Sequence, residues 1–158
     1  MQPAIPRFDG HYGHWSMLME NLLRSKGYWS QVEVGYEEPK AEASLSDAGR
    51  KKLEEVRTTD LKVKNYLVKR STLQALRRDF EILEMKVGET ITTYFARVMT
   101  IANQMRSYGE QMSESTIVEK ILRTLTERFN YIVVLIEESK DIDSLTIDEL
   151  QSSLVVHK

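Results

Sequence analysis

Apolar side chains recur three and four positions apart along most of the chain, which is the spacing of one face of an α-helix. The first such run begins near Trp15 and ends before Gly27, a residue that commonly follows the last turn of a helix. A shorter apolar element follows it. The segment 33–44 contains Gly35 and Pro39 and is therefore predicted to be a loop.

The longest uninterrupted pattern runs from Ser46 to Met85, with no proline and only one glycine, Gly49. It predicts one very long helix, or two helices joined without a proper turn. A helix of about 40 residues is about 60 Å long, which exceeds what a small monomer can cover. We therefore expect its apolar stripe to contact a second chain. The candidate self-association residues are Val56, Val63, Tyr66, Leu73, Leu76, Phe80 and Leu83.

Helical spacing resumes after Gly88 and continues to Gly109, with Phe95 on the apolar face. Ser113 is the expected N-cap of the next helix. The segment 131–136 is rich enough in β-branched residues to be a strand, but its helical neighbours favour a helix.

The last helix has the clearest local start signal. Thr146 and Glu149 have the spacing of a capping box, and Leu145 and Leu150 have the spacing of a hydrophobic staple across it. The pattern as a whole therefore predicts an all-α fold.

Composition narrows the class of protein further. The 158 residues are 41% apolar and 29% charged, which suits one compact domain or two small ones. The chain has no cysteine, which excludes disulfides, thiol nucleophiles and zinc knuckles and fits a reducing compartment. The net charge of −2, the lack of a long apolar run and the lack of signal-peptide order argue against a membrane partner. We expect a cytoplasmic protein, with the nucleus left open.

Two of the three histidines, His11 and His14, lie close to Asp9 and raise the question of a metal site. Such a site needs a third or fourth ligand that is rigidly held, and His157 lies at the far end of the chain. A solvated turn is the favoured interpretation. No serine lies in a nucleophile elbow, and there is no P-loop or dinucleotide motif. We therefore expect no enzyme, no catalytic or metal site, no cofactor and no small-molecule substrate.

The middle of the chain is locally basic, which raises the possibility of a nucleic-acid surface. These charges alternate with the apolar stripe, as on any amphipathic helix, so a solvated face is favoured over RNA binding. The candidate nucleic-acid contacts are Lys62, Lys64, Lys69, Arg70, Arg77 and Arg78.

The order of motifs is more specific than any one residue. The stretch "RFDGHYGHWSMLMENLLRSKGYWSQVEVGYEEP" resembles the N-terminal signature of plant copia-type retrotransposon Gag polyproteins. The resemblance continues through "STLQALRRDFEILEMKVGETITTYFARVMTIANQMRSYGE" and "ILRTLTERFNYIVVLIEESKDIDSLTIDELQSSLVVH". It implies a capsid-like, all-α protein with an N-terminal and a C-terminal helical lobe. "VGETITTYFARVMTIANQM" occupies the place of the family's C-terminal-lobe homology segment.

The chain departs from that family pattern at one junction. Members usually have several tens of residues between the "DLKVKNYL" type segment and the "VKRSTLQALRRDF" type segment, whereas here Leu67 joins Val68 directly. We therefore expect a truncated N-terminal lobe, residues 1–67, joined by a long helix to a C-terminal lobe, residues 68–158. The expected structural anchors are Phe8, Gly10, Trp15, Trp29, Gly88 and Phe95.

A truncated lobe has a physical consequence. The surviving N-terminal helices are expected to expose an apolar face that includes Trp15, Leu18, Leu22 and Trp29. The leading hypothesis is a domesticated Gag-derived protein that forms homodimers or higher oligomers, or that interferes with a full-length Gag. The alternatives are an RNA-binding protein that uses the basic central helix, and a host adaptor that retained only the fold. RNA binding is expected to be weak, because the chain has no zinc knuckle.

Overall fold

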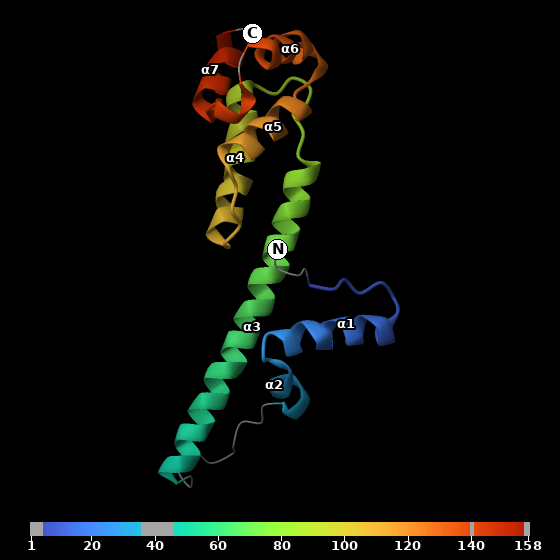
Figure 1. Cartoon of the computed structure of the whole chain (residues 1–158), viewed down its shortest axis with the longest axis vertical. Coiled ribbons are helices and arrows are strands. Elements are labelled where there is room, and N and C mark those ends of the chain that lie inside the picture. The colour runs from blue at the N-terminus through green and yellow to red at the C-terminus, as the bar shows by residue number, and fades with distance from the viewer. Residues whose placement is uncertain (1–4, 36–45, 140, 157–158) are drawn as a thin grey trace. The chain divides into compact units, whose positions relative to one another are not determined.

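The computed structural model describes residues 5–35, 46–139 and 141–156. Within them every regular element is a helix and no strand occurs, which confirms the predicted all-α class (Figure 1). The helices are α1 (Tyr12–Ser25), α2 (Trp29–Val34), α3 (Asp47–Ile82), α4 (Ile91–Ser107), α5 (Glu114–Thr124), α6 (Asn130–Ser139) and α7 (Ile147–Val156), with single 3₁₀ turns η2 (Glu127–Phe129) and η3 (Ile142–Ser144). No described helix combines the length and hydropathy that crossing a bilayer requires.

Contacts divide the chain into two compact units, Met1–Gln74 and Ala75–Lys158, which we call unit 1 and unit 2. Helix α3 begins in unit 1 and ends in unit 2. The lobe boundary expected between Leu67 and Val68 stays a prediction.

Unit 1 contains α1, α2 and most of α3. Helix α1 ends in a Schellman motif, in which Gly27 has a φ of 71°. The Tyr28 N–H donates to the Leu23 carbonyl at 2.9 Å, and the Gly27 N–H donates to the Arg24 carbonyl at 3.0 Å. The chain then turns directly into α2. The rings of Tyr28 and Tyr66 meet edge to face at 5.6 Å, and the Gln74 side chain donates to the Ile5 carbonyl at 2.9 Å.

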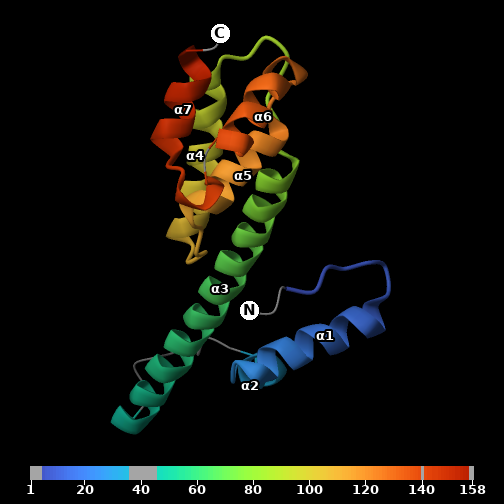
Figure 2. The same cartoon turned by 45° about the horizontal axis from the view of Figure 1, so that its top comes forward.

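Unit 2 contains the end of α3 and the helices α4 to α7. Helices α4, α5 and α7 contact one another, and α6 lies beside η2 (Figure 2). The interior is apolar and tightly covered. Its largest fully buried side chains are Tyr94, Ile91, Ile117, Ile121, Leu150, Leu154, Val98 and Val118.

The helix starts in unit 2 follow the sequence signals. The Ser113 hydroxyl accepts from the Thr116 N–H, as predicted for an N-cap. Thr146 and Glu149 form the predicted capping box, in which the Glu149 carboxylate accepts from the Thr146 N–H at 3.1 Å and the Thr146 hydroxyl accepts from the Glu149 N–H at 3.3 Å. The ambiguous segment 131–136 is helical, and it lies within α6.

The long central pattern forms one continuous helix of 36 residues, which settles the choice between one helix and two. At about 1.5 Å per residue its length is about 54 Å. It ends at Ile82, so the expectation that helical structure reaches Met85 is wrong by three residues. Part of the predicted loop 33–44, including Pro39, lies outside the described residues.

Candidate functional site

The segment before α1 contains a small aromatic cluster. Phe8 meets Trp15 edge to face at 5.8 Å, and the Trp15 indole N–H donates to the Pro6 carbonyl at 3.1 Å. Gly10 has a φ of 95°, a conformation that strongly favours glycine, and provides the turn between the two rings. The Phe8 side chain is exposed, and its ring contacts the ring of Trp15.

Of the two histidines near this cluster, His11 belongs to the turn before α1 and His14 lies in the first turn of α1. The His11 N–H donates to the Asp9 carboxylate at 3.0 Å, and His14 is exposed. Among the residues that the structure describes, no group of three or more histidine, aspartate or glutamate side chains could hold a metal ion. His157 lies outside the described residues.

Among the described residues of α2 and α3, the buried polar side-chain atoms that have no hydrogen-bond partner include Trp29 Nε1, Gln31 Nε2 and the Tyr66 hydroxyl. Buried polar groups in folded proteins are nearly always paired, and each unpaired group costs about 1–3 kcal/mol. The predicted anchor Trp29 is half-buried, with the Arg24 guanidinium 5.4 Å from its ring centre. This part of unit 1 is therefore incompletely satisfied within one chain.

The apolar stripe predicted along α3 is largely covered within the chain. Val63, Leu73 and Phe80 are buried, and the other four candidates are half-buried. Those four are Val56, Tyr66, Leu76 and Leu83. A second chain could therefore reach the buried members only if segments were exchanged between chains.

Most of the apolar side chains exposed in unit 1 are not those of the face that the sequence predicted to be exposed. Leu22 is buried, so the apolar face that was expected to be exposed on α1 is smaller than predicted. The larger apolar side chains that are exposed on the helices of unit 1 are Tyr12, Met17, Leu18, Val32, Val34, Leu61 and Val68.

The candidate RNA-binding residues do not form one free basic surface. Arg70 is buried, and Arg77 donates to the Glu110 carboxylate. Lys64 pairs with Asp60 at 2.7 Å.

The exposed members of this set are Lys62, Lys64, Lys69 and Arg78. Lys62 and Lys69 are seven positions apart and share a face of α3. Arg78, nine positions after Lys69, lies about half a turn away. A continuous phosphate-binding stripe would need these charges on one side.

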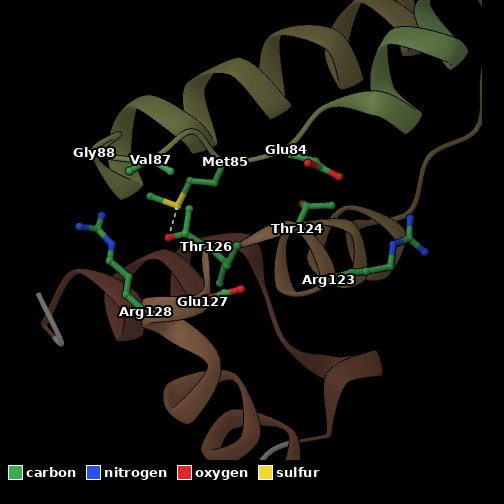
Figure 3. A pocket seen from close by; sticks show the side chains of 10 residues that line it. Glu84, Met85, Val87, Gly88, Arg123, Thr124, Thr126, Glu127 and Arg128 are labelled. Carbon is green, nitrogen blue, oxygen red and sulfur yellow. Dashed lines mark hydrogen bonds between the residues drawn. The ribbon is translucent and has the colours of Figure 1, made fainter.

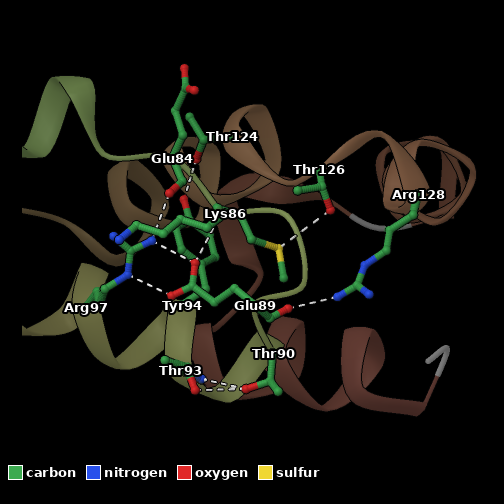
Figure 4. A network of polar contacts seen from close by, with 11 residues as sticks. Glu84, Lys86, Glu89, Thr90, Thr93, Tyr94, Arg97, Thr124, Thr126 and Arg128 are labelled. Atoms are coloured by element: carbon green, nitrogen blue, oxygen red, sulfur yellow. Dashed lines mark hydrogen bonds and ion pairs between the residues drawn. The ribbon is translucent and has the colours of Figure 1, made fainter.

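The best-defined polar site in unit 2 is the turn between α3 and α4 (Figure 4). Arg97 donates through Nε and Nη2 to the two oxygens of Glu89, each at 2.7 Å, and Nη2 also donates to the Glu84 carbonyl at 2.8 Å. The Glu89 carboxylate accepts the Lys86 N–H at 2.9 Å, and the Glu89 carbonyl accepts from Arg128 at 2.9 Å. Glu89 thus joins the turn to Arg97 on α4 and to Arg128 on η2.

Electrostatics favours the charged form of this carboxylate. Hydrogen bonding by Arg97 holds the pKa of Glu89 below its ordinary value of 4.5, against the opposing effect of burial. Burial raises the pKa of Tyr94, whose ring lies 5.7 Å from the Arg97 guanidinium. The arrangement fixes the turn between α3 and α4.

Gly88 and Phe95 were expected as structural anchors in this region, whereas the pairing of Glu89 with Arg97 was not predicted. Gly88 has a φ of 80° and forms the turn, and Phe95 is buried in the core of the unit. The available signal in the sequence was an acidic residue, Glu89, directly after the glycine and a basic residue, Arg97, eight positions later. That pair was hidden among many other charged residues.

A pocket of about 680 Å³ lies beside this turn (Figure 3). One wall is the segment 84–88, and the other is the segment 123–128, which contains the last two residues of α5 and the turn after it. Met85 joins the two walls, because its N–H donates to the Thr124 carbonyl at 3.0 Å and its sulfur accepts from the Thr126 hydroxyl. Arg123 and Arg128 lie at opposite ends of the pocket.

Comparison with known families identifies one match. The sequence model of the gag-polypeptide of LTR copia-type matches residues 64–158, which is more than half of the chain and includes all of unit 2. Neither the curated proteins nor the solved structures yielded a match. The family match confirms the resemblance inferred from the sequence, whereas the missing helices before Val68 stay a prediction.

Proposed function

The chain belongs to the copia-type LTR gag-polypeptide family, and on that premise we propose that this Gag-derived, capsid-related protein acts by self-association through unit 1. Burial of apolar helical surface between chains provides the free energy of association, and no catalytic step is involved. The second polypeptide is another copy of this chain or a full-length Gag.

The observation that carries the proposal is the incomplete covering of unit 1. Val32 and Val34 on α2 are exposed beside the buried, unpaired atoms of Trp29 and Gln31. A protein partner removes both features if segments are exchanged between chains, because the partner then covers the apolar surface and brings acceptors to the buried donors. A backbone carbonyl of a second helix end or loop would satisfy either donor.

Light scattering of the full chain tests the proposal. We expect the molar mass to rise from the monomer's 18.4 kDa to at least the dimer's as concentration increases into the tens of micromolar. The double variant Val32→Ser/Val34→Ser should shift this transition to at least about tenfold higher concentration, since two valines lose their apolar contact.

The chain offers a matched control. Val155 and Val156 on α7 are also exposed, but they belong to unit 2. Val155→Ser/Val156→Ser makes the same chemical change and should leave the transition where it is. A strict monomer at tens of micromolar, or equal effects of the two double variants, would contradict association through unit 1.

Mixing with an assembling full-length Gag separates the two possible consequences. If this chain interferes with assembly, particle yield in electron micrographs should fall as its molar ratio to Gag increases. The Val32→Ser/Val34→Ser variant should interfere less. An unchanged yield across all ratios would exclude interference and leave self-association alone to be tested by light scattering.

A further inference from the structure

Helix α3 ends at Ile82 although the residues that follow favour a helix. The next five, Leu83 to Val87, contain no proline or glycine, and four of them are leucine, glutamate, methionine and lysine, which are good helix formers. The first residue suited to ending the helix is Gly88, whose φ is 80°. Local preference alone would therefore carry α3 about one turn further.

Two residues of α5 replace the hydrogen bond that would continue α3. In a longer helix the Met85 N–H would donate to the Glu81 carbonyl. In the structure the Met85 N–H donates instead to the Thr124 carbonyl at 3.0 Å, and the Glu81 carbonyl accepts from Lys120 Nζ at 2.6 Å. Lys120 and Thr124 are one turn apart on α5. This one helix therefore pairs with both the donor and the acceptor of the hydrogen bond that would continue α3.

The neighbouring backbone groups are held in the same way. The Lys86 N–H, which would reach the Ile82 carbonyl in a helix, donates to the Glu89 carboxylate at 2.9 Å. The Glu84 carbonyl accepts from Arg97 at 2.8 Å. The non-helical path of this segment thus depends on groups supplied by α4, α5 and the turn itself.

Lys120 is the unusual member of this set, because it is a lysine that is 2% exposed. Its ammonium lies 5.8 Å from the centre of the Phe80 ring and at the C-terminal end of α3, where the helix carbonyls carry partial negative charge. Burial lowers its pKa, Glu81 and Glu84 oppose that shift, and Arg123 adds to it. A buried charge of this kind contributes little net stability compared with an apolar side chain of similar volume.

We propose that residues 83–86 form a helix-extension switch controlled by Lys120. With Lys120 bonded to the Glu81 carbonyl, α3 ends at Ile82. When that bond is released, α3 continues to Lys86 and becomes about 6 Å longer, at about 1.5 Å per residue. The proposal concerns unit 2 alone and does not depend on self-association.

The pocket of Figure 3 is tied to one position of this switch. The segment 84–88 forms one of its walls, and the bond from Met85 to Thr124 joins that wall to the other. Coiling of the segment removes the wall and therefore the pocket. A molecule that fills the pocket would bind only the short form of α3 and would shift the population toward it.

The variant Lys120→Met tests the switch, because it keeps the length and apolar stem of the side chain and removes the donor. In nuclear magnetic resonance spectra of the full chain, the Cα shifts of Leu83 to Lys86 should move to helical values. A contact between the Ile82 Hα and the Met85 N–H should also appear. The helical fraction of the segment should rise from the roughly 0.1–10% of a minor state to a majority.

Two further variants separate the switch from a general loosening. Lys86→Met makes the same chemical change within the segment and leaves its backbone bonds intact, so its spectrum should match the wild type. Val87→Pro disfavours the helical conformation of Lys86, and the Val87 side chain is 98% exposed. Adding it to Lys120→Met should return residues 83–86 to non-helical shifts.

The proposal is overturned if Lys120→Met leaves the shifts of 83–86 as in the wild type, or if Lys86→Met changes them equally. If the resonances of α4 to α7 are no longer dispersed in Lys120→Met, the variant has lost its folded core, and the test is then made on the wild-type chain. Chemical-exchange saturation transfer should then detect a minor state with helical shifts at 83–86. The absence of any exchange at those residues would equally overturn the proposal.

Discussion

The two units differ sharply in how much of their apolar surface they cover. Among the described residues, four apolar side chains of unit 1 are buried and eight large ones are exposed, whereas unit 2 buries eighteen and also exposes eight. Unit 2 therefore has the core of an independent domain, and the family match covers all of it. Unit 1 depends on a few helix contacts, which explains why a partner is proposed there.

The sharpest test of this difference is the same substitution in both units. Leu150→Ala, at a fully buried position of α7, should lower the free energy of unfolding of unit 2 by about 3–4 kcal/mol, because it leaves a cavity in a packed core. Leu18→Ala, at an exposed position of α1, should change the free energy of unfolding of unit 1 by less than about 0.5 kcal/mol. Urea denaturation followed by circular dichroism measures both. Equal losses would show that the two units are not distinct in packing.

The clamped turn is the next strongest feature of unit 2. Arg97→Met should lower stability by about 2–3 kcal/mol, because it removes three charge-assisted hydrogen bonds and leaves Glu89 poorly solvated. Arg78→Met is the control, since Arg78 is exposed and lies 3.7 Å from Asp79 on the surface of α3. That variant should be close to neutral. A large effect of Arg78→Met would indicate that surface charge, and not the turn, is responsible.

The same carboxylate makes unit 2 sensitive to acid. The pKa of Glu89 is lowered in the folded chain, so its contribution to stability is present above the unfolded value of about 4.5. That contribution is lost as pH falls through the lower, folded pKa. Glu89→Gln should therefore flatten the fall in unfolding free energy at acidic pH. A wild-type slope in the variant would assign the acid sensitivity to other carboxyls.

How far these features could be predicted depends on the distance in sequence between the groups that make them. The capping box of Thr146 and Glu149 and the turn at Gly27 were predicted correctly, because each is made by neighbours in the sequence. The end of α3 at Ile82 was missed, because the atoms that stop it belong to α5, about 40 residues later. The pairing of Glu89 with Arg97 was not predicted, because the sequence alone does not distinguish a buried ion pair from two solvated charges.

The aromatic cluster before α1 tests whether unit 1 has any local order of its own. Trp15→Ala removes the edge contact with Phe8 and the bond to Pro6, and should lower the stability of unit 1 by about 1–2 kcal/mol, less than a fully buried tryptophan would. His14→Ala, one residue earlier and exposed, should be nearly silent. Hydrogen exchange of the α1 amides measures both variants. If Trp15→Ala leaves exchange unchanged, the cluster does not seat α1.

The smallest expected effect concerns the start of α7. Thr146→Ala removes the hydroxyl that accepts from the Glu149 N–H and that also contacts the Glu149 carboxylate, and should cost about 1 kcal/mol. Thr146→Ser keeps the hydroxyl and should restore most of the loss. Ser152→Ala, at an exposed position of the same helix, controls for the change in helix propensity. Because Leu150 and Leu154 anchor α7 in the core, the helix should persist in every variant, with faster amide exchange confined to its first turn. Loss of the whole helix in Thr146→Ala would mean that the cap, and not the core of unit 2, holds α7 in place, and would reverse the contrast between the two units at this end of the chain.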